Sequence, residues 1–502
     1  MSGVAIRSKS LKVGLEIHVE LKTRSKMFTR TPNVAHPDFE DAAPNTLVDP
    51  VVAALPGTLP VMNRVAVEMS MLVGLALHCD IARFSKWDRK NYYYPDLPKG
   101  YQISQYDLPL CHDGWHMIQS ASGEEHRVGI IRAHLEEDTG KLGHELPGGH
   151  RYSGSLVDLN RAGTPLLEIV THPDFDNADD VVTFAQDLRN LCRFLGVTQG
   201  VMQRGHMRFE PNINLEMTLE DGREVCTPIV EVKNLNSFRA LSGAIEYEYV
   251  RQEKAWLEDG IEMGPGAKST RGWDDEKLVT VLQREKEDAH DYRYFPDPDL
   301  VPVIVDDAWL ESVQSQLPEL PAVRRERYMS TFGLRAKDAD ALLDERGLAD
   351  FFEASAATLE EESGAGALAK LLLNQAAKRA NEAGCFAHEL GIAPEQMAGV
   401  VALRAGNEIG AQSIDALLAL LEESDDPTRA VAESGGLLVV LDESQLEAWC
   451  QDAIQNNEQA ADDVRNGKMA AIGRLVGHVM KLSKGSVDAQ AVQAKLRDLL
   501  SS

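Results

Sequence analysis

Three polar side chains alternate with aliphatic residues near the start of the chain. Glu16, His18 and Glu20 are separated by single apolar residues within the stretch 13–21, and this period of two is typical of a half-buried β-strand. At the usual rise per strand residue, neighbouring side chains on this polar face stand roughly 7 Å apart. Carboxylates and an imidazole at that spacing can bind a divalent cation if further carboxylates approach from other strands. The alternative is a solvated strand face with ordinary charges.

Two later acidic motifs supply candidate partners for this strand. In residues 134–141, three adjacent acids precede a lysine, which is unfavourable crowding unless solvent or a cation neutralises it. In residues 165–170, a single glutamate interrupts an apolar run and faces either a polar cavity or a sheet edge. An ordinary structural role stays open for each motif alone, but together they form an oxygen-rich set suited to Mg²⁺. The candidate metal ligands are Glu16, His18, Glu136 and Glu168.

Two further polar groups follow along the chain. Segments 208–214 and 231–238 place acid and amide side chains two apart on expected strands, where they can bind ribose or phosphate; solvent-facing alternation is the alternative. In segment 290–299, Arg293 stands between aromatic residues. It can stack on a base or fix a domain junction, and we favour the junction because helical composition begins directly afterwards.

The sequence pattern divides the chain into different kinds of structure. From residue 11 to about residue 300, short alternating segments with glycine and proline punctuation predict mixed α and β structure. After a proline-rich connector the periodicity is helical to the end, and Pro394 is placed to open a new helix. We therefore expect an α+β protein with a catalytic domain at residues 1–302, a helical domain at 303–393 and a helical tail domain at 394–502.

Composition and charge exclude several classes of protein. The formal net charge is -28, so bulk attraction cannot hold a nucleic acid. Residues 341–460 carry 22 acidic and 6 basic side chains, whereas residues 461–502 carry 7 basic and 4 acidic ones, which favours the tail for contact with a polyanion. No apolar run reaches the roughly 18 residues of a membrane span, and the start lacks a signal pattern. We expect a cytoplasmic protein without membrane partners.

Many long motifs in a fixed order carry a family resemblance. They begin with Val13-Gly-Leu-Glu-Ile-His-Val-Glu-Leu21 and run essentially to the end of the chain. In this order they closely resemble the B subunit of the aspartyl/glutamyl-tRNA amidotransferases. The other motifs lie at 88–95, 101–105, 134–141, 157–168, 233–238, 270–273, 291–296, 467–468, 475–477 and 479–485.

The resemblance implies a fold and a reaction. Family members have a cradle-like α+β catalytic domain, a helical domain and an all-helical tail that binds tRNA. They work as heterotrimers in which an amidase subunit frees ammonia from glutamine and a small third subunit wraps both partners. The B subunit uses ATP and Mg²⁺ to phosphorylate the side-chain carboxylate of glutamate on tRNA(Gln) or aspartate on tRNA(Asn), and ammonia then displaces phosphate.

By implication the protein is a carbon–nitrogen ligase with glutamine as amido donor. The alternative is a non-catalytic tRNA-binding scaffold of the same complex. The residues expected to act in catalysis are Glu16, His18, Lys90, Glu137 and Glu168, of which Lys90 and Glu137 match a charged pair near an ammonia channel that is either a gate, a proton relay or structural. The expected metal ligands are Glu16, His18, Glu136 and Glu168; the expected ATP region contains Glu210, Asn212 and Lys233; the expected tRNA contacts are Lys468, Arg474, Lys481 and Lys484.

The chain departs from its family at a few positions. Residues 49–52 are Asp-Pro-Val-Val where many relatives carry Cys-Pro-x-Cys, and no Cys-x-x-Cys pair occurs elsewhere, so we expect no zinc. Glu210 replaces a usual aspartate. The extra methylene moves the carboxylate, which leaves open whether Glu210 is a metal ligand.

Overall fold

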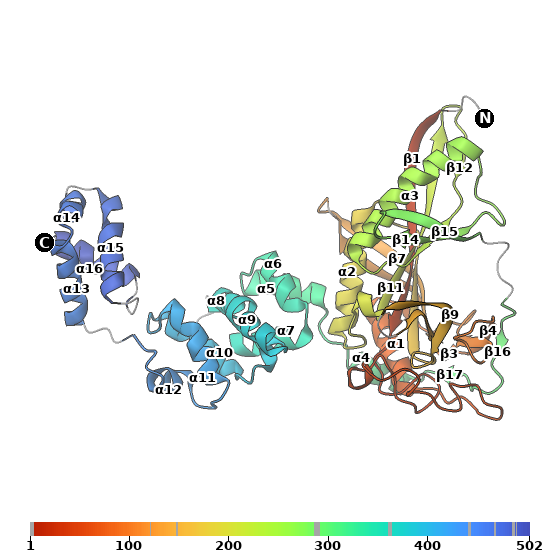
Figure 1. Cartoon of the computed structure of the whole chain (residues 1–502), viewed down its shortest axis with the longest axis horizontal. Coiled ribbons are helices and arrows are strands. Elements are labelled where there is room, and N and C mark those ends of the chain that lie inside the picture. The colour runs from red at the N-terminus through yellow and green to blue at the C-terminus, as the bar shows by residue number, and fades with distance from the viewer. Residues whose placement is uncertain are drawn as a thin grey trace. The chain divides into compact units, whose positions relative to one another are not determined.

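The computed structural model describes the chain in two units with separate cores (Figure 1). The first unit is Met1–Leu320 and the second is Pro321–Ser502. The described residues are 5–120, 122–146, 149–285, 292–359, 364–439, 443–465, 468–483, 487 and 489–501.

A 13-stranded sheet is the framework of the first unit. Its main path has the order β15-β14-β13-β11-β1-β10-β7-β5-β4-β16, and β12, β2 and β6 pair beside it. The bounds are β1 (Ile6–Glu20), β2 (Asp80–Ile81), β4 (Asp88–Asn91), β5 (Tyr101–Ser104), β6 (Cys111–Gln119), β7 (Glu125–Glu137), β10 (Pro165–Thr171), β11 (Met207–Leu219), β12 (Glu224–Cys226), β13 (Val230–Lys233), β14 (Ser269–Asp274), β15 (Val279–Glu285) and β16 (Phe295–Pro296). Two separate pairs are β3 (Phe84–Ser85) with β17 (Val303–Ile304), and β8 (Lys141–Leu146) with β9 (His150–Asp158).

Strand β1 confirms the alternation predicted from the sequence. Val13, Leu15, Ile17 and Val19 are each at most 1% exposed and belong to the main core. Because successive side chains on a strand point to opposite faces, the intervening polar residues lie on the other face of the sheet. The apolar face of β1 therefore builds the core, and its polar face is left for chemistry.

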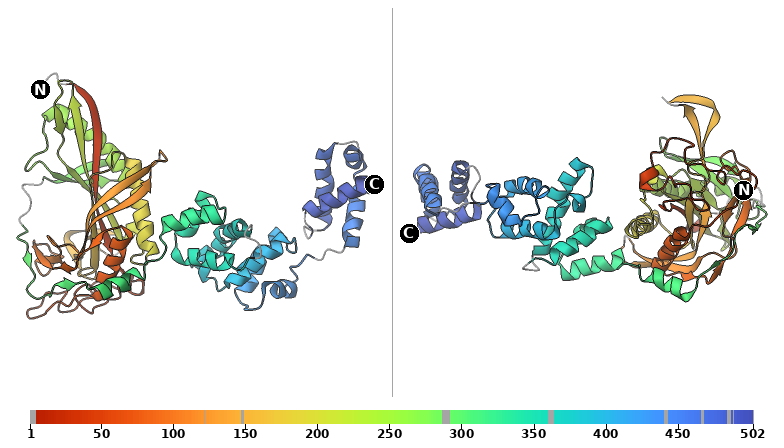
Figure 2. Two further views of the ribbon diagram at one scale, coloured as in Figure 1. Left: turned by 180° about the vertical axis from the view of Figure 1, so that it is seen from behind. Right: turned by 90° about the horizontal axis from the view of Figure 1, so that it is seen from below.

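Helices cover the apolar face of this sheet. Figure 1 and the left view of Figure 2 show α2 (Ala178–Phe194) and α3 (Phe238–Asp259) against the sheet, and the two helices pack on each other. Each begins at a capping side chain, because Asn177 accepts a hydrogen bond from the Asp180 amide and Ser237 accepts one from the Ala240 amide. The first unit also contains α1 (Arg64–Ala76) and α4 (Asp307–Gln314), which pack on each other.

The first unit extends further than the sequence predicted. The expected boundary at residue 302 is wrong, because β17 pairs with β3 and α4 packs on α1. Val303, Val305 and Val313 are each 2% exposed and belong to the core of the first unit. These short elements carry too few apolar residues to form a core of their own, so they stay with the sheet.

The second unit is helical, as the periodicity predicted. Pro394 occupies the start of its helix, the position that its missing N–H favours. The boundary expected at residue 393 lies within this unit and stays a prediction. The helices are α5 (Pro321–Thr331), α6 (Ala336–Leu343), α7 (Arg346–Ala356), α8 (Ala365–Leu371), α9 (Ala377–Ala383), α10 (Pro394–Ala405), α11 (Ile414–Leu421), α12 (Thr428–Ser434), α13 (Glu443–Gln455), α14 (Glu458–Arg465), α15 (Ile472–Leu482) and α16 (Ala489–Ser501).

The chain thus has an α+β fold with a helical C-terminal region. None of the helices in the described residues has the length and apolar character that crossing a membrane requires.

Candidate functional site

Strands β1, β7 and β10 bring a first cluster together. Their antiparallel register places His18 opposite Glu168, and Glu168 opposite His134. Glu136 follows His134 by two residues and so lies on the same face of β7. One ligand atom from each of His18, Glu136 and Glu168 lies within 4.8 Å of the others. Three of the four predicted metal ligands therefore meet at one point.

Two imidazoles flank the carboxylate of Glu168. Its Oε2 lies 3.6 Å from Nε2 of His18 and 3.6 Å from Nε2 of His134. Burial alone would raise the pKa of Glu168, but the adjacent histidines hold it well below its usual range. Burial lowers the pKa of His134 to about 4. Burial would also lower the pKa of His18, but its contact with Glu168 and the charge of Glu210 raise it. The surroundings thus favour the ionised form of Glu168 and the neutral form of His134.

The donor set of this first cluster fits a divalent cation. Among the described residues, Oε2 of Glu136 and Nδ1 of His18 are buried without a hydrogen-bond partner. A buried unpaired acceptor destabilises a fold by roughly 1–3 kcal/mol, and by more when it is charged. Nζ of Lys90 is 4.0 Å from Oε2 of Glu136, which is too long for a hydrogen bond. Mg²⁺ accepts carboxylate oxygens as ligands and completes its coordination with water.

Glu16 belongs to a second cluster, next along β1. Ligand atoms of Glu16, Glu210 and Glu231 lie within 4.8 Å of one another. Nζ of Lys233 is 2.5 Å from Oε2 of Glu210 and 3.0 Å from Oε1 of Glu231, and Asn212 donates a hydrogen bond of 3.1 Å to Glu16. Burial raises the pKa of Glu16, and the charges of Glu168, Glu231 and Glu210 raise it further.

The expectation of one four-residue cluster is therefore corrected to two neighbouring clusters. Glu16 and His18 are two residues apart on one strand, so each meets a different set of neighbours across the sheet. Glu16 is opposite Glu210 on β11, whereas His18 is opposite Glu168 on β10. The three residues expected near ATP, Glu210, Asn212 and Lys233, all lie in the second cluster; contact with ATP stays a prediction.

The expected ion pair between Lys90 and Glu137 is not formed. Consecutive residues of a strand point to opposite faces, so Glu136 faces Lys90 while Glu137 faces away. The carboxylate of Glu137 instead accepts hydrogen bonds from Lys99 and from the amide of Ile103. A gate or relay built on a Lys90–Glu137 pair thus has no support in this arrangement.

Glu20, the last residue of β1, lies in a buried charge network. NH1 of Arg208 is 3.8 Å from Oε1 of Glu20, and NH2 of Arg208 donates a 2.9 Å hydrogen bond to Asp138. Burial and the charge of Asp138 raise the pKa of Glu20 to about 8. Burial would raise the pKa of Asp138 too, but Arg161 and Arg208 lower it to about 2. The surroundings thus favour the negative charge on Asp138 over a negative charge on Glu20.

Two residues of these clusters were not predicted as site residues. His134 lies two residues before Glu136, and Glu231 lies two residues before Lys233. In each pair, period-two alternation puts both side chains on one strand face. The alternation within residues 134–136 and 231–233 is therefore the sequence signal that identifies both residues.

The aromatic segment after residue 291 is not a domain junction. Phe295 of β16 pairs with Arg89 of β4, and the side chain of Asn91 donates to the carbonyl oxygens of Tyr292 and Arg293. This segment thus lies along the β4 edge of the sheet and well before the boundary at Leu320. The junction role favoured for Arg293 is wrong.

The predicted tRNA contacts lie in the helical tail. Arg474 and Lys481 are exposed on α15, seven positions apart and hence on one side of the helix. Lys468 is exposed and forms a 2.9 Å ion pair with Asp463. Lys484 lies outside the described residues. Contact with tRNA stays a prediction for all four residues.

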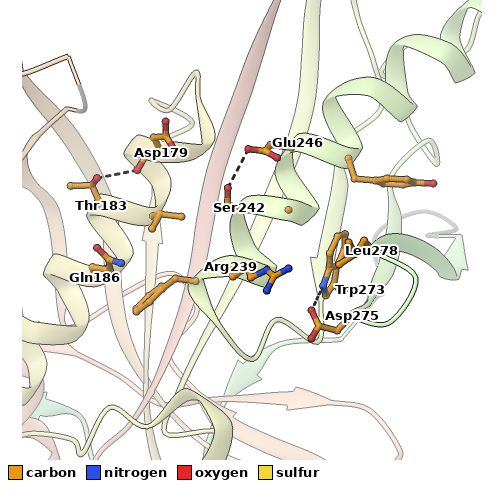
Figure 3. Close-up of a pocket in the computed structure, with 13 residues that line it drawn as sticks. Asp179, Thr183, Gln186, Arg239, Ser242, Glu246, Trp273, Asp275 and Leu278 are labelled. Carbon is orange, nitrogen blue, oxygen red and sulfur yellow. Dashed lines mark hydrogen bonds between the residues drawn. The ribbon is translucent and has the colours of Figure 1, made fainter.

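A separate surface groove of about 800 Å³ lies among α2, α3 and the β14–β15 turn. Figure 3 shows Asp179 and Gln186 on one side of it and Arg239 and Trp273 on the other. The helices cover the apolar face of the sheet, whereas both carboxylate clusters are on the polar face. Since none of the predicted site residues lines the groove, its volume does not locate the chemistry.

Comparison with known proteins shows the family of the chain. Residues 11–311 match the GatB/GatE catalytic domain, and residues 350–500 match the GatB domain. Three similar relatives are each named as the B subunit of an aspartyl/glutamyl-tRNA(Asn/Gln) amidotransferase. The protein of Thermomicrobium roseum is 44% identical, with 97% of this chain and 98% of the relative covered. Those of Rhodopirellula baltica and Caldicellulosiruptor saccharolyticus are 42% and 41% identical, each over 97% of this chain and over 96% and 98% of the relative. The chain therefore belongs to the family of the B subunits of aspartyl/glutamyl-tRNA(Asn/Gln) amidotransferases.

Proposed function

We propose that the protein is the ATP-dependent subunit of a glutamine-hydrolysing, tRNA-dependent amidotransferase. It phosphorylates the side-chain carboxylate of Glu-tRNA(Gln), Asp-tRNA(Asn) or both, and ammonia then produces Gln-tRNA(Gln) or Asn-tRNA(Asn). A separate amidase subunit supplies the ammonia, and a small third subunit makes the assembly a cytoplasmic heterotrimer. The names of the relatives support the tRNA substrates and an assembly of several subunits.

The observation that carries this proposal is the pair of carboxylate clusters on neighbouring positions of β1. Phosphoryl transfer requires positioning and charge neutralisation more than covalent chemistry from the protein. Buried acidic clusters with unpartnered acceptor atoms destabilise a fold, and a scaffold that only binds tRNA has no use for them. The clusters therefore favour the catalytic role over the scaffold role.

The reaction proceeds in two steps, phosphoryl transfer and displacement of phosphate by ammonia. A carboxylate oxygen of the esterified amino acid takes the γ-phosphoryl group of ATP, and ADP leaves. Ammonia then attacks the acyl carbon, the carbon–oxygen bond to phosphate breaks, and the nitrogen loses a proton to give the amide. Mg²⁺ held by His18, Glu136 and Glu168 would supply neutralisation of the phosphate charge.

Two lysines of the chain are suited to binding the phosphate groups. Burial alone would lower the pKa of Lys90 and of Lys233. For Lys90 the charge of Glu136 outweighs burial, and for Lys233 the charges of Glu210 and Glu231 do so, which raises the pKa of both. Both side chains stay charged at neutral pH, one beside each cluster, and can orient phosphate oxygens.

The test is transfer of radiolabelled γ-phosphate from ATP to misacylated tRNA by the assembled heterotrimer. Glu168→Ala should abolish transfer while leaving tRNA binding near normal, because it removes the carboxylate between the two imidazoles. Glu276→Ala, a change at an exposed acid outside both clusters, is the matched control and should transfer phosphate normally. If the wild-type complex binds tRNA but transfers no phosphate, the scaffold role replaces this proposal. If Glu168→Ala keeps full transfer, the site assignment is wrong.

A further inference from the structure

Three tyrosine rings are exposed in the short segment that follows Lys90. Tyr93 is 90% exposed, Tyr94 is 61% exposed and Tyr106 is 53% exposed. Tyr93 and Tyr94 lie between β4 and β5, and Tyr106 follows β5. Aromatic rings stabilise a fold chiefly when they are buried, so the core does not explain three exposed rings in so short a segment. The grouping of exposed rings in one segment makes that segment a candidate interaction site.

The loop that carries these rings is held in one conformation by its own backbone. The amide of Leu97 donates to the carbonyl oxygen of Tyr94, and the amide of Gly100 donates to that of Leu97. Gly100 has φ +74°, and a Cβ atom there would lie 3.0 Å from Cε1 of Tyr93. Only glycine fits this backbone conformation without strain and leaves room for the ring. The ring of Tyr93 thus has one edge near the backbone of Gly100, while most of its surface faces solvent.

Tyr106 is fixed in a different way. Its ring stacks on that of Tyr294, with ring centroids 4.2 Å apart and an angle of 10° between the planes. Its amide also donates to the carboxylate of Asp88. One face of the Tyr106 ring is thus covered by another ring while the side chain stays half exposed. Rings that are ordered before a ligand arrives lose little entropy on binding.

The exposed rings adjoin the candidate site. Lys90 precedes Tyr93 by three residues, so their Cα atoms are at most roughly 10 Å apart. Nζ of Lys90 is 4.0 Å from Oε2 of Glu136 and 5.4 Å from the ring centre of Tyr292. Strand β5 joins β7 where Ser104 is opposite Glu136. The β4–β5 hairpin therefore presents a lysine to the first cluster and tyrosines to solvent.

The charge of this segment permits approach of a polyanion. Residues 86–106 contain four basic and two acidic side chains in a chain of net charge -28. Nζ of Lys99 lies 5.4 Å from the ring centre of Tyr101, and the guanidinium of Arg89 lies 4.3 Å from it. Each of the four basic side chains pairs with a carboxylate, and most of those carboxylates lie outside the segment. The hairpin and its partners are thus free of unpaired positive charge, and stacking on the exposed rings has to supply the attraction for a nucleic acid. Aromatic rings with interleaved cations are typical of surfaces that bind single-stranded nucleic acid.

We infer that Tyr93, Tyr94 and Tyr106 form a stacking platform for the unpaired bases at the 3′ end of the aminoacylated tRNA. This inference rests on the proposed function, because the amino acid to be phosphorylated is esterified to that 3′ end and must reach the first cluster. Stacking is tolerant of sequence because every base has an aromatic face. The adenine of ATP is the other base at this site, but a single purine needs one ring, whereas several exposed rings fit a strand of successive bases.

The test uses the assembled heterotrimer and misacylated tRNA with 2-aminopurine in place of the terminal adenine. The fluorescence of 2-aminopurine falls when the base stacks, so binding to the wild-type complex should quench it. Tyr93→Ala and Tyr94→Ala should reduce the quenching and raise the KM for tRNA about 5- to 150-fold, the range for one lost base–ring stack, with kcat nearly unchanged because the lost contact is present throughout the reaction. Tyr93→Phe and Tyr94→Phe keep the ring and should behave as wild type. Tyr152→Ala, at a tyrosine that is 44% exposed on β9, is the matched control.

The outcomes separate this inference from the proposed function. If the wild-type complex phosphorylates the tRNA and the alanine variants quench and turn over like wild type, the platform is refuted and the proposed function stands. If the alanine variants raise the KM for ATP and leave that for tRNA unchanged, the rings bind adenine of ATP and the inference is overturned. If the wild-type complex binds tRNA with quenching but transfers no phosphate, the platform is supported and the catalytic proposal fails.

Discussion

Replacing Lys90 by methionine tests the electrostatics of the first cluster. The substitution keeps the length of the side chain and removes the ammonium group 4.0 Å from Oε2 of Glu136. Glu136 is 3% exposed, and burial already raises its pKa from 4.5. Without its cationic neighbour, Glu136 avoids a buried charge by taking up a proton. Taking up a proton above the unfolded-state pKa costs about 1.36 kcal/mol for each pH unit. At pH 7, which is about 2.5 units above 4.5, the loss in the free energy of unfolding is therefore limited to about 3.4 kcal/mol.

The sign of the pH dependence follows from the same reasoning. When the pKa of a carboxyl group is higher in the folded state than in the unfolded state, the folded protein becomes less stable as the pH rises above the unfolded-state pKa. Lys90→Met should therefore lower the free energy of unfolding by less than about 1 kcal/mol at pH 5 and by up to about 3 kcal/mol at pH 7. Urea unfolding in EDTA, followed by tryptophan fluorescence, measures this difference, because five of the six tryptophans lie in the first unit. Lys254→Met, at a side chain that is 76% exposed, is the control.

One result would refute the electrostatic reasoning. This result is an equal decrease in the free energy of unfolding of Lys90→Met at pH 5 and at pH 7. It would mean that the variant is destabilised by lost packing of the lysine stem and not by the lost charge beside Glu136. A second measurement repeats the titration with Mg²⁺ in place of EDTA. Since a cation bound by the first cluster would neutralise Glu136 in either protein, Mg²⁺ should recover more stability in Lys90→Met than in wild type.

Three further predictions concern other parts of the chain. Glu20→Gln should be more stable than wild type by an amount that grows from pH 5 to pH 8 in urea unfolding, because the pKa of Glu20 is raised to about 8 and the amide never ionises; a pH-independent difference would contradict this. Arg474→Glu combined with Lys481→Glu should raise the KM for tRNA and lower the salt slope of binding by about 2, without changing kcat; an unchanged slope would exclude these residues as phosphate contacts. Metal analysis of the purified protein should find no zinc, and bound zinc would contradict this expectation. Asp49→Ala should lower the melting temperature, because Asp49 accepts hydrogen bonds from Thr29 and from the amide of Val52; an unchanged melting temperature would contradict this.

The alternation of residues on β1 was sufficient to predict which side chains face the core and which face the site. It did not predict which neighbours they meet, because register across a sheet depends on the whole set of paired strands. For this reason the sequence placed Glu16 in the first cluster, whereas β11 draws it to Glu210 and Glu231. The same period of two puts residues 136 and 137 on opposite faces of β7. Since Lys90 faces Glu136, the predicted Lys90–Glu137 pair is excluded.

Domain limits were predictable only where composition changes sharply. The helical C-terminal region follows from its periodicity, and its helices are present in the structure. The end of the first unit was missed because the two-residue strand β17 and the short helix α4 have no periodicity strong enough to show that they belong to the sheet. Their attachment comes from tertiary contacts of Val303, Val305 and Val313, which no local pattern encodes.

Strand β1 fixes the distance between the two clusters. Glu16 and His18 are joined by a single intervening residue, so the spacing of the clusters along this strand is set by covalent backbone geometry, at roughly 7 Å. Loop movements elsewhere in the protein leave that interval unchanged. A one-residue insertion between Glu16 and His18 would turn one of the two side chains into the apolar core, which makes this short stretch intolerant of length variation even where its side chains can be exchanged.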